Sequence, residues 1–289
     1  MTPAGVGGLF LILTLALILG EAFWLRRTGR AYDWAETTAS FGVALGNIMV
    51  GVVTGQFIST AFEQLGASAV LHIDAGDWRA WLIGFLLLEF LYYWMHRWSH
   101  TIRWMWTSHS VHHSANNYTL PAAIRLGWTS FVSGTWLVFT PMALVGFPTE
   151  MIILLLAANL KYQFLLHTQL IDRLGPLEWV LNTPSHHRVH HGANPQCLDR
   201  NFGGVLIVFD RLFGTFVDER SLTEPIRYGL TRPIKSHNPF VIAFREWDNM
   251  GHDFTTARTL PQAMATLWRV SDEQLEDTPV PIEGQNSQC

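Results

Sequence analysis

The chain has 289 residues, of which 49% are apolar, 13% are aromatic and only 15% are charged. A typical soluble domain carries about a quarter charged residues, so this composition points to lipid as part of the surroundings. The net charge is −4 and no Lys/Arg run is present, which excludes a polyanion binder, and we expect no nucleic acid partner. Cys197 and Cys289 are too few for a disulfide framework, and a reducing compartment is the simplest interpretation.

Hydropathy predicts an all-α, multi-pass membrane helix bundle of four or five spans. The first span, Val6–Trp24, is followed directly by Arg26, Arg27 and Arg30, which the positive-inside rule places in the cytosol. A cleavable signal peptide is the alternative, but no Lys or Arg precedes the apolar run. The further spans are expected at Thr38–Phe62, Ala80–Met95, Trp128–Phe147 and Thr149–Leu166.

Small residues predict how some of these spans pack. Gly42 and Gly46, and likewise Gly51 and Gly55, form small-xxx-small pairs in the second span. Such pairs favour close packing inside the bundle, with a homodimer face as the alternative. The sequence Gly-Phe-Pro at 146–148 predicts a tight turn, so the last two spans are expected to form a helical hairpin.

Short apolar runs, turn signals and most of the charge follow from His167 onward. This part is therefore predicted to be a cytosolic helical cap, which ends in a polar tail from about Ser271. We divide the chain into N-terminal membrane spans (1–79), a catalytic domain (80–218) and a cytosolic C-terminal tail (219–289).

Ten of the thirteen histidines lie between His96 and His191, mostly in the motifs YYWMHRWSH, HSVHH and HHRVHH. On a helix His96 and His100 lie one turn apart on one stripe, and each HxxHH motif places its three histidines on one face. Packing alone seldom requires adjacent histidines, so metal ligation is favoured over chance or an electrostatic surface. The predicted motif ligands are His96, His100, His109, His112, His113, His187, His190 and His191.

Eight imidazoles are too many for one tetrahedral zinc ion and suit two metal ions. The predicted topology puts all of them on the cytosolic face, and His72, expected outside, is excluded as a ligand. His167 lies at the cytosolic end of the last span and is predicted to be a ninth ligand, with a supporting or interfacial role as the alternative. His186 lies off the helical face of its motif and is not favoured as a ligand. His237 and His252 lack a partner spacing, so we interpret them as surface residues of the cap.

Glu89 is an ionisable residue deep in the third span, where insertion costs roughly 2.5–3.5 kcal/mol. It precedes His96 by two helical turns on the same stripe. This position predicts a catalytic or substrate-channel role beneath the metals, and an interhelical hydrogen bond is the alternative. Asn159 and Gln163 are interpreted as hydrogen-bonding groups inside the bundle, and Cys197 as a packing residue.

The histidine motifs resemble those of the fatty acid hydroxylase/sterol desaturase superfamily. The resemblance runs from about Glu89 to Pro233 and includes LGPLEWVLNTPSHHRVHHGANPQCLDRNFGGVLIVFDRLFGTF and YGLTRPI. It implies a di-iron centre that activates O2, with the eight motif histidines as ligands. It also implies tetrahydrobiopterin or another external reductant. The stretch ANNYTLPAAIR keeps Arg125 but places Thr119 and Pro121 inside the family's pattern, so the lipid substrate stays open.

These observations predict an O2-dependent di-iron membrane oxygenase that hydroxylates or desaturates an alkyl lipid, a fatty acyl chain or a sterol. An external electron donor is expected because no GxGxxG follows a strand pattern and no haem-binding module is found. The membrane is expected to be the endoplasmic reticulum or a bacterial inner membrane, with the active site on the cytosolic side. A metal transporter or metal-binding membrane protein is the main alternative, although transport sites belong near the bilayer midplane. A zinc hydrolase would require Glu178 or Asp199 as general base.

Overall fold

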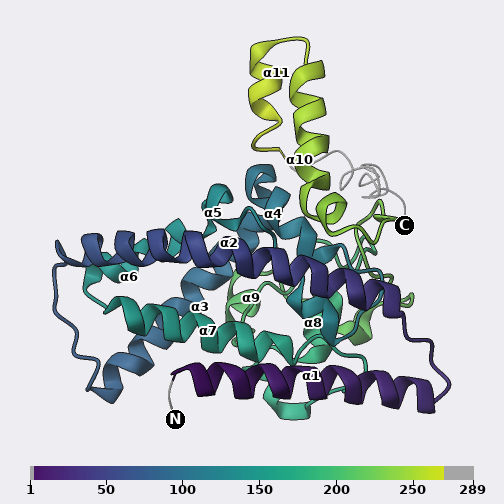
Figure 1. Ribbon diagram of the computed structural model, residues 1–289, viewed down its shortest axis with the longest axis horizontal. Coiled ribbons are helices and arrows are strands. Elements are labelled where there is room, and N and C mark those ends of the chain that lie inside the picture. The colour runs from purple at the N-terminus through teal and green to yellow at the C-terminus, as the bar shows by residue number, and fades with distance from the viewer. Residues whose placement is uncertain (1–2, 270–289) are drawn as a thin grey trace, which may run out of the picture.

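The computed structural model describes residues 3–269, and every regular element in this part of the chain is a helix (Figure 1). The predicted all-α class is therefore confirmed. The longest helices are α1 (Pro3–Arg27), α2 (Trp34–Gly66), α3 (Trp78–Thr101) and α7 (Thr149–Phe164). In Figure 1, α1, α2 and α7 run lengthwise beside one another. The predicted polar tail from Ser271 and residue Cys289 lie outside the described residues.

Two helices, α1 and α2, are long and apolar enough to cross a membrane by length and composition. Residues 8–27 have a mean hydropathy of 2.2, and the apolar part of α2 is only 6% buried. Val52, for example, is 75% exposed. A helix with this much uncovered apolar surface needs lipid or another protein around it, because water would leave that surface unfavourably hydrated. The first two predicted spans thus coincide with candidate membrane helices, while the full number of spans stays a prediction.

The predicted span Trp128–Phe147 is wrong as a single helix. The chain there forms α5 (Ser130–Ser133), η2 (Thr135–Phe139) and α6 (Thr140–Val145). Gly134 adopts a left-handed backbone with φ 77°, which ends α5, and Pro141 lacks the N–H that would continue a helix from η2. Hydropathy correctly identifies this stretch as apolar, but it carries no information on the helix breaks at Gly134 and Pro141.

The predicted turn before the last span is present. Gly146 adopts φ 116°, and a Cβ atom there would lie 1.9 Å from the carbonyl oxygen of Leu71, so only glycine fits. The helix α7 begins at Thr149 and runs back along the bundle, where it packs against α3. Leu88, Tyr92, Met151 and Ile152 form the core between these two helices.

The two glycine pairs of α2 have different surroundings. A Cβ atom on Gly42 would lie 2.5 Å from Pro239, and one on Gly46 would lie 2.2 Å from the Trp128 ring, so this pair packs inside the protein as predicted. No neighbouring atom lies within 4 Å of the corresponding positions at Gly51 and Gly55.

Short helices joined by irregular segments carry the rest of the described chain. They are α4 (Arg103–His113), η1 (Leu120–Ile124), η3 (Gly175–Trp179), α8 (Pro184–His190), α9 (Val208–Phe213), η4 (Glu219–Ser221), α10 (Pro239–Thr256) and α11 (Leu260–Ala265). They hold most of the histidines, and in Figure 1 α8 and α9 lie between α2 and α1 in the view, away from the ends of these helices. Their cytosolic location stays a prediction.

Candidate metal centre

The histidine motifs lie on α3, α4 and α8. α3 extends past its predicted end and carries His96 and His100 in its last turns. Ile102 then adopts an extended backbone, with φ −110° and ψ 114°, which turns the chain so that α4 packs against α3. α8 and its C-cap residue carry the third motif, and His167 lies in the turn after α7.

Nine buried or nearly buried histidines form two groups, and within each group the candidate ligand atoms lie within 4.8 Å of one another. The first group is His96, His100, His109, His113 and His190, and the second is His112, His167, His187 and His191. Each HxxHH motif supplies side chains to both groups, which places the two groups side by side. The structure thus brings together all nine histidines predicted as ligands and leaves His186 outside both groups.

The distances between ring nitrogens suit metal coordination. The Nε2 atoms of His96 and His109 are 3.0 Å apart, and Nε2 of His167 lies 3.2 Å from that of His112, His187 and His191. Two nitrogens that each lie about 2.1 Å from a shared ion are separated by roughly 3.0–3.4 Å. His167 Nδ1 faces the carbonyl oxygen of Gln163 at 2.7 Å and must carry the proton. Its Nε2 then has one lone pair, which cannot serve three neighbouring rings but can bind one ion that they share.

Burial favours the neutral form of seven of these rings, on α4, α8 and the turn after α7. It lowers the pKa of His112 to about 4 and the pKa values of six others well below the usual value, because a charged imidazolium is unfavourable away from water; these six are His109, His113, His167, His187, His190 and His191. A neutral imidazole offers the free lone pair that a metal ion requires. Buried Nε2 atoms of His100 and His190 have no hydrogen-bond partner, as expected of nitrogens built to bind an ion.

Backbone carbonyls orient several of the rings. His96 Nδ1 donates to the carbonyl oxygen of Phe202 over 2.7 Å, and His190 Nδ1 donates to that of Arg200 over 2.9 Å. His100 Nδ1 lies 3.6 Å from the carboxylate of Asp199. Each contact fixes the ring that bears it and directs Nε2 toward the centre of the group.

Asp210 supports this arrangement and is missed by the sequence analysis. Its carboxylate accepts the backbone N–H groups of Phe202 and Gly203 and the hydroxyl of Thr215 over 2.7–2.8 Å. Burial raises the pKa of Asp210 to about 6, which these hydrogen bonds partly oppose. Because Asp210 fixes the chain at Phe202, it determines where the carbonyl that orients His96 lies.

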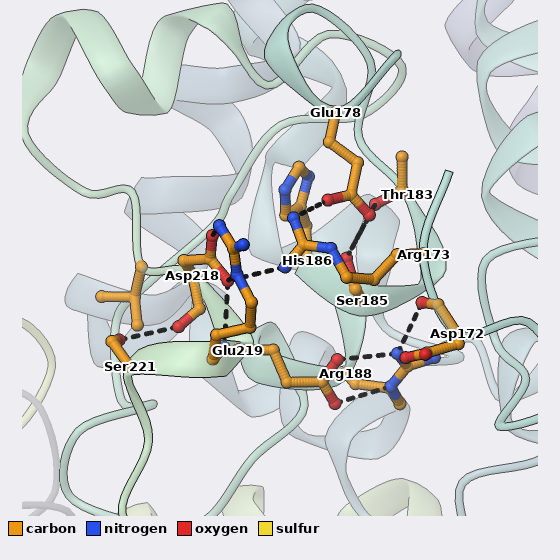
Figure 2. Close-up of polar contacts among 12 residues, drawn as sticks. Asp172, Arg173, Glu178, Thr183, Ser185, His186, Arg188, Asp218, Glu219 and Ser221 are labelled. Atoms are coloured by element: carbon orange, nitrogen blue, oxygen red, sulfur yellow. Dashed lines mark hydrogen bonds and ion pairs between the residues drawn. The ribbon is translucent and has the colours of Figure 1, made fainter. Parts of the chain in front are cut away.

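A polar network holds α8 from its outer side (Figure 2). Arg188 lies between the histidines of the third motif, and its guanidinium donates to Glu219 over 2.7–2.8 Å and to the carbonyl oxygens of Ile171 and Asp172. Glu178 accepts the hydroxyl of Ser185 over 2.7 Å and forms an ion pair with Arg173. The Glu178 carboxylate therefore stabilises the start of α8, and these contacts disfavour a role as general base.

Three buried acids on the first three long helices anchor segments that flank the histidines. Glu21 of α1 accepts the backbone N–H of Leu120 over 2.7 Å. Glu36 of α2 accepts those of residues 116 and 117, just after the second motif, and lies 3.4 Å from the guanidinium of Arg125. Neither Glu21 nor Glu36 was predicted to have a role. Their position in apolar helices could have indicated one, because an acid is costly there.

Glu89 is the third of these acids. Its Oε2 atom accepts the backbone N–H groups of Val205 and Leu206 over 2.7 and 2.9 Å, and Oε1 accepts the side-chain amide of Asn159. Gln163 in turn bonds to Asn159 and Tyr92, as predicted for hydrogen bonds inside the bundle. Glu89 is not among the described residues that line the cavities beside the histidines. These contacts favour a positioning role for Glu89 over direct participation in chemistry.

Two cavities reach the histidines. The larger, of about 600 Å³, lies among α1, α2, α3 and α7, is mostly apolar and ends at His109, His112 and His167. The smaller, of about 40 Å³, reaches the first group at His100, His113 and His190. It is also lined by Asp199, whose left-handed backbone (φ 56°) is unusual for a non-glycine residue. The apolar lining of the large cavity suits an alkyl chain.

A model of the fatty acid hydroxylase family matches residues 81–215, which contain all nine histidines. Residues 81–215 belong to the fatty acid hydroxylase family. The relationship predicted from the motifs is therefore confirmed. This fatty acid hydroxylase domain, residues 81–215, contains most of α3 and all of α4, α7, α8 and α9. The helices α1 and α2 precede it.

Several lipid hydroxylases are similar in sequence to this chain. Alkylglycerol monooxygenase of Xenopus tropicalis is 48% identical over 56% of this chain and 35% of its own length, and that of Homo sapiens is 45% identical over 57% and 36%. Ornithine lipid hydroxylase OlsE of Rhizobium tropici is 26% identical over 68% of this chain and 60% of its own. The chain thus spans about a third of the length of the alkylglycerol monooxygenases. No solved structure matches it.

Proposed function

We propose that this protein is an O2-dependent di-iron membrane oxygenase that hydroxylates the alkyl chain of a lipid. The observation that carries the proposal is that a large apolar cavity reaches both groups of histidines, at His109, His112 and His167. The names of the curated relatives support lipid hydroxylation as the reaction class. An alkylglycerol ether lipid is the substrate that we favour, because the most similar of the relatives described above are alkylglycerol monooxygenases.

The nine histidines would hold the two ions, five rings in the first group and four in the second. Two bound irons supply the activation of O2 that insertion into an unactivated C–H bond needs. The protein's own residues perform the remaining tasks. Carbonyl and carboxylate contacts fix the rings, and the apolar wall of the large cavity excludes water and presents one part of an alkyl chain to His109, His112 and His167.

The position of the cavity determines which carbon is oxidised. The lining residues Ile58 and Phe62 belong to the far part of α2, while Ser99 and Gln163 lie close to the histidines. An alkyl chain that enters this cavity therefore extends along α2 and α7, and only a short part of it meets the histidine end. Hydroxylation and desaturation begin with the same hydrogen abstraction, and the names of the relatives favour hydroxylation.

Electrons come from an external donor in this proposal, with tetrahydrobiopterin or another reductant as the candidate. The small cavity beside Asp199 is separate from the alkyl-chain cavity and gives the reductant or O2 a second approach. Location in the endoplasmic reticulum or a bacterial inner membrane, with the centre on the cytosolic side, stays a prediction. A homodimer through Gly51 and Gly55, whose outer side no other described segment approaches within 4 Å of a Cβ position, is likewise a prediction.

The test uses the purified full chain in lipid nanodiscs, loaded with Fe²⁺ without oxygen. We expect two irons per chain, and oxidised alkylglycerol only when both O2 and a reductant are supplied, with the product identified by mass spectrometry. His112→Ala should abolish iron loading of the second group and activity together. Metal flux into vesicles without oxygen consumption would instead support the transporter alternative.

A further inference from the structure

The hairpin of α10 and α11 projects away from the long helices, crosswise to α1 and α2 (Figure 1). One face of α10 is fixed to the protein through Ile242, Ala243 and Met250, which are buried. Glu246 on the same face pairs with Arg103 of α4 over 3.0 Å. This anchoring gives α10 a defined direction and a defined outer face.

The outer face of the hairpin is an apolar stripe, which we call the aromatic stripe. On α10 it consists of Phe240, Phe244 and Phe254, which are 66%, 44% and 39% exposed, with Trp247 partly buried between them. Their spacing places them on one side of the helix. We also count as part of the stripe Leu260, Met264 and Trp268, which lie four residues apart on and just after α11 and are 46–71% exposed.

Polar residues occupy the neighbouring side of α10. Arg245, Asp248 and His252 are exposed and lie about a quarter to a third of a turn from the aromatic stripe. The helix is thus divided lengthwise among a side fixed to the protein, a polar side and an apolar side that stays largely exposed, with the Trp128 ring against its first turns. This division is the pattern of a helix that lies in a membrane interface.

The position of α10 along α2 agrees with such a location. α2 has 33 residues and is about 50 Å long, whereas the hydrocarbon core of a bilayer is about 30 Å thick. Its buried polar residues Glu36 and Ser40 lie near its start, and its long run of exposed apolar side chains follows from Phe41 onward. The boundary of the hydrocarbon core therefore falls near Gly42, which contacts Pro239 at the first position of α10.

The surface of α2 and the aromatic stripe are continuous. The ring of Trp128 packs against Gly46 of α2 and edge-on against Phe240 and Phe244, with ring centroids 5.0 and 5.8 Å apart. We propose that the α10–α11 hairpin is an in-plane membrane anchor whose aromatic stripe inserts into the lipid leaflet beside α2. The hairpin carries three arginines (245, 258 and 269) and three acids (246, 248 and 253), so binding relies on apolar contact rather than on anionic lipid.

Spin labels on single introduced cysteines test this proposal in the full chain, reconstituted in phosphatidylcholine nanodiscs. The parent is Cys289→Ser, since Cys197 is buried and does not compete for the label. Labels are placed at Phe240, Phe244 and Met264 on the stripe, with Asp248 and His252 as matched controls on the polar side of α10. Relaxation by O2, which concentrates in lipid, is compared with relaxation by a water-soluble nickel chelate at each position.

We expect the ratio of O2 to nickel accessibility to be severalfold higher at the stripe positions than at the two controls, and to change little in high salt. Equal access of the nickel chelate to both sides would overturn the proposal, because the hairpin would then stand in water. Protection of the stripe from both reagents would also overturn it and would indicate contact with a second protein. Gel filtration and iron content of each labelled variant establish that it is folded.

Discussion

The Nε2 atoms of His112 and His167 lie 3.2 Å apart although 55 positions separate the two residues in the chain. His112 comes from α4 and His167 from the turn after α7, so this contact joins the second histidine motif to a residue outside all three motifs. His186, in contrast, belongs to the third motif by sequence but to neither group of candidate ligands. Membership of a motif is therefore neither required nor sufficient for a place in the centre. His167 has such a place without a motif, and His186 has a motif without such a place.

His167→Ala should remove the metal of the second group. Loss of one ligand from a site of four, with no other described side chain placed to replace it, should lower occupancy of that group by at least about tenfold. Iron per chain is measured by elemental analysis, and the environment by Mössbauer spectroscopy. The control is His186→Ala, which should retain both irons. Full occupancy in His167→Ala would remove this residue from the ligand set.

Glu89→Gln separates a positioning role from a chemical one. The glutamate accepts three N–H donors, whereas a glutamine amide turns one acceptor into a donor and leaves at least one buried N–H unsatisfied. We expect a loss of about 1–3 kcal/mol in stability and lower iron occupancy. Thermal unfolding and iron content report the effect, with exposed Glu150→Gln of α7 as the control. Normal stability and iron content with lost activity would instead identify a catalytic group.

Ile58→Trp should shorten the alkyl chain that the large cavity accepts. Ile58 lines the part of the cavity far from the histidines, so a larger side chain there obstructs the end of a long chain and leaves a short one unaffected. We expect kcat/KM to fall roughly tenfold for a long-chain substrate relative to a short-chain one. Val53→Trp, on the exposed side of α2, serves as the control and should change neither value. An equal loss for both chain lengths would show that the chain does not extend toward Ile58.

Arg188→Lys should weaken the support of the third motif. Lysine keeps the charge but loses the two-pronged contact with Glu219 and the simultaneous contacts with the carbonyl oxygens of Ile171 and Asp172. Weakening the Arg188–Glu219 ion pair should lower the free energy of unfolding by at most about 3 kcal/mol, because Glu219 is partly exposed to water. Differential scanning fluorimetry with and without iron measures the loss. Arg220→Lys, at a side chain that is 72% exposed, should be neutral.

Local patterns in the sequence determine the candidate ligands and several elements of the fold. The spacing of His96 and His100, and of the two HxxHH motifs, depends only on helical geometry, so the candidate ligands could be predicted without coordinates. The tight turn at Gly146 and the first two apolar helices follow from residue types over short stretches. In each case the information lies within one or two helical turns.

Only the tertiary structure decided features that depend on distant residues. It divided each HxxHH motif between two groups of histidines, and it gave Glu89 partners at Val205 and Leu206, over a hundred residues away. It also broke the apolar stretch at Gly134, which hydropathy could not reveal. The physical reason is that hydrophobic periodicity reports which side of an element is apolar, whereas the partner of a buried polar atom is chosen when separate elements pack together.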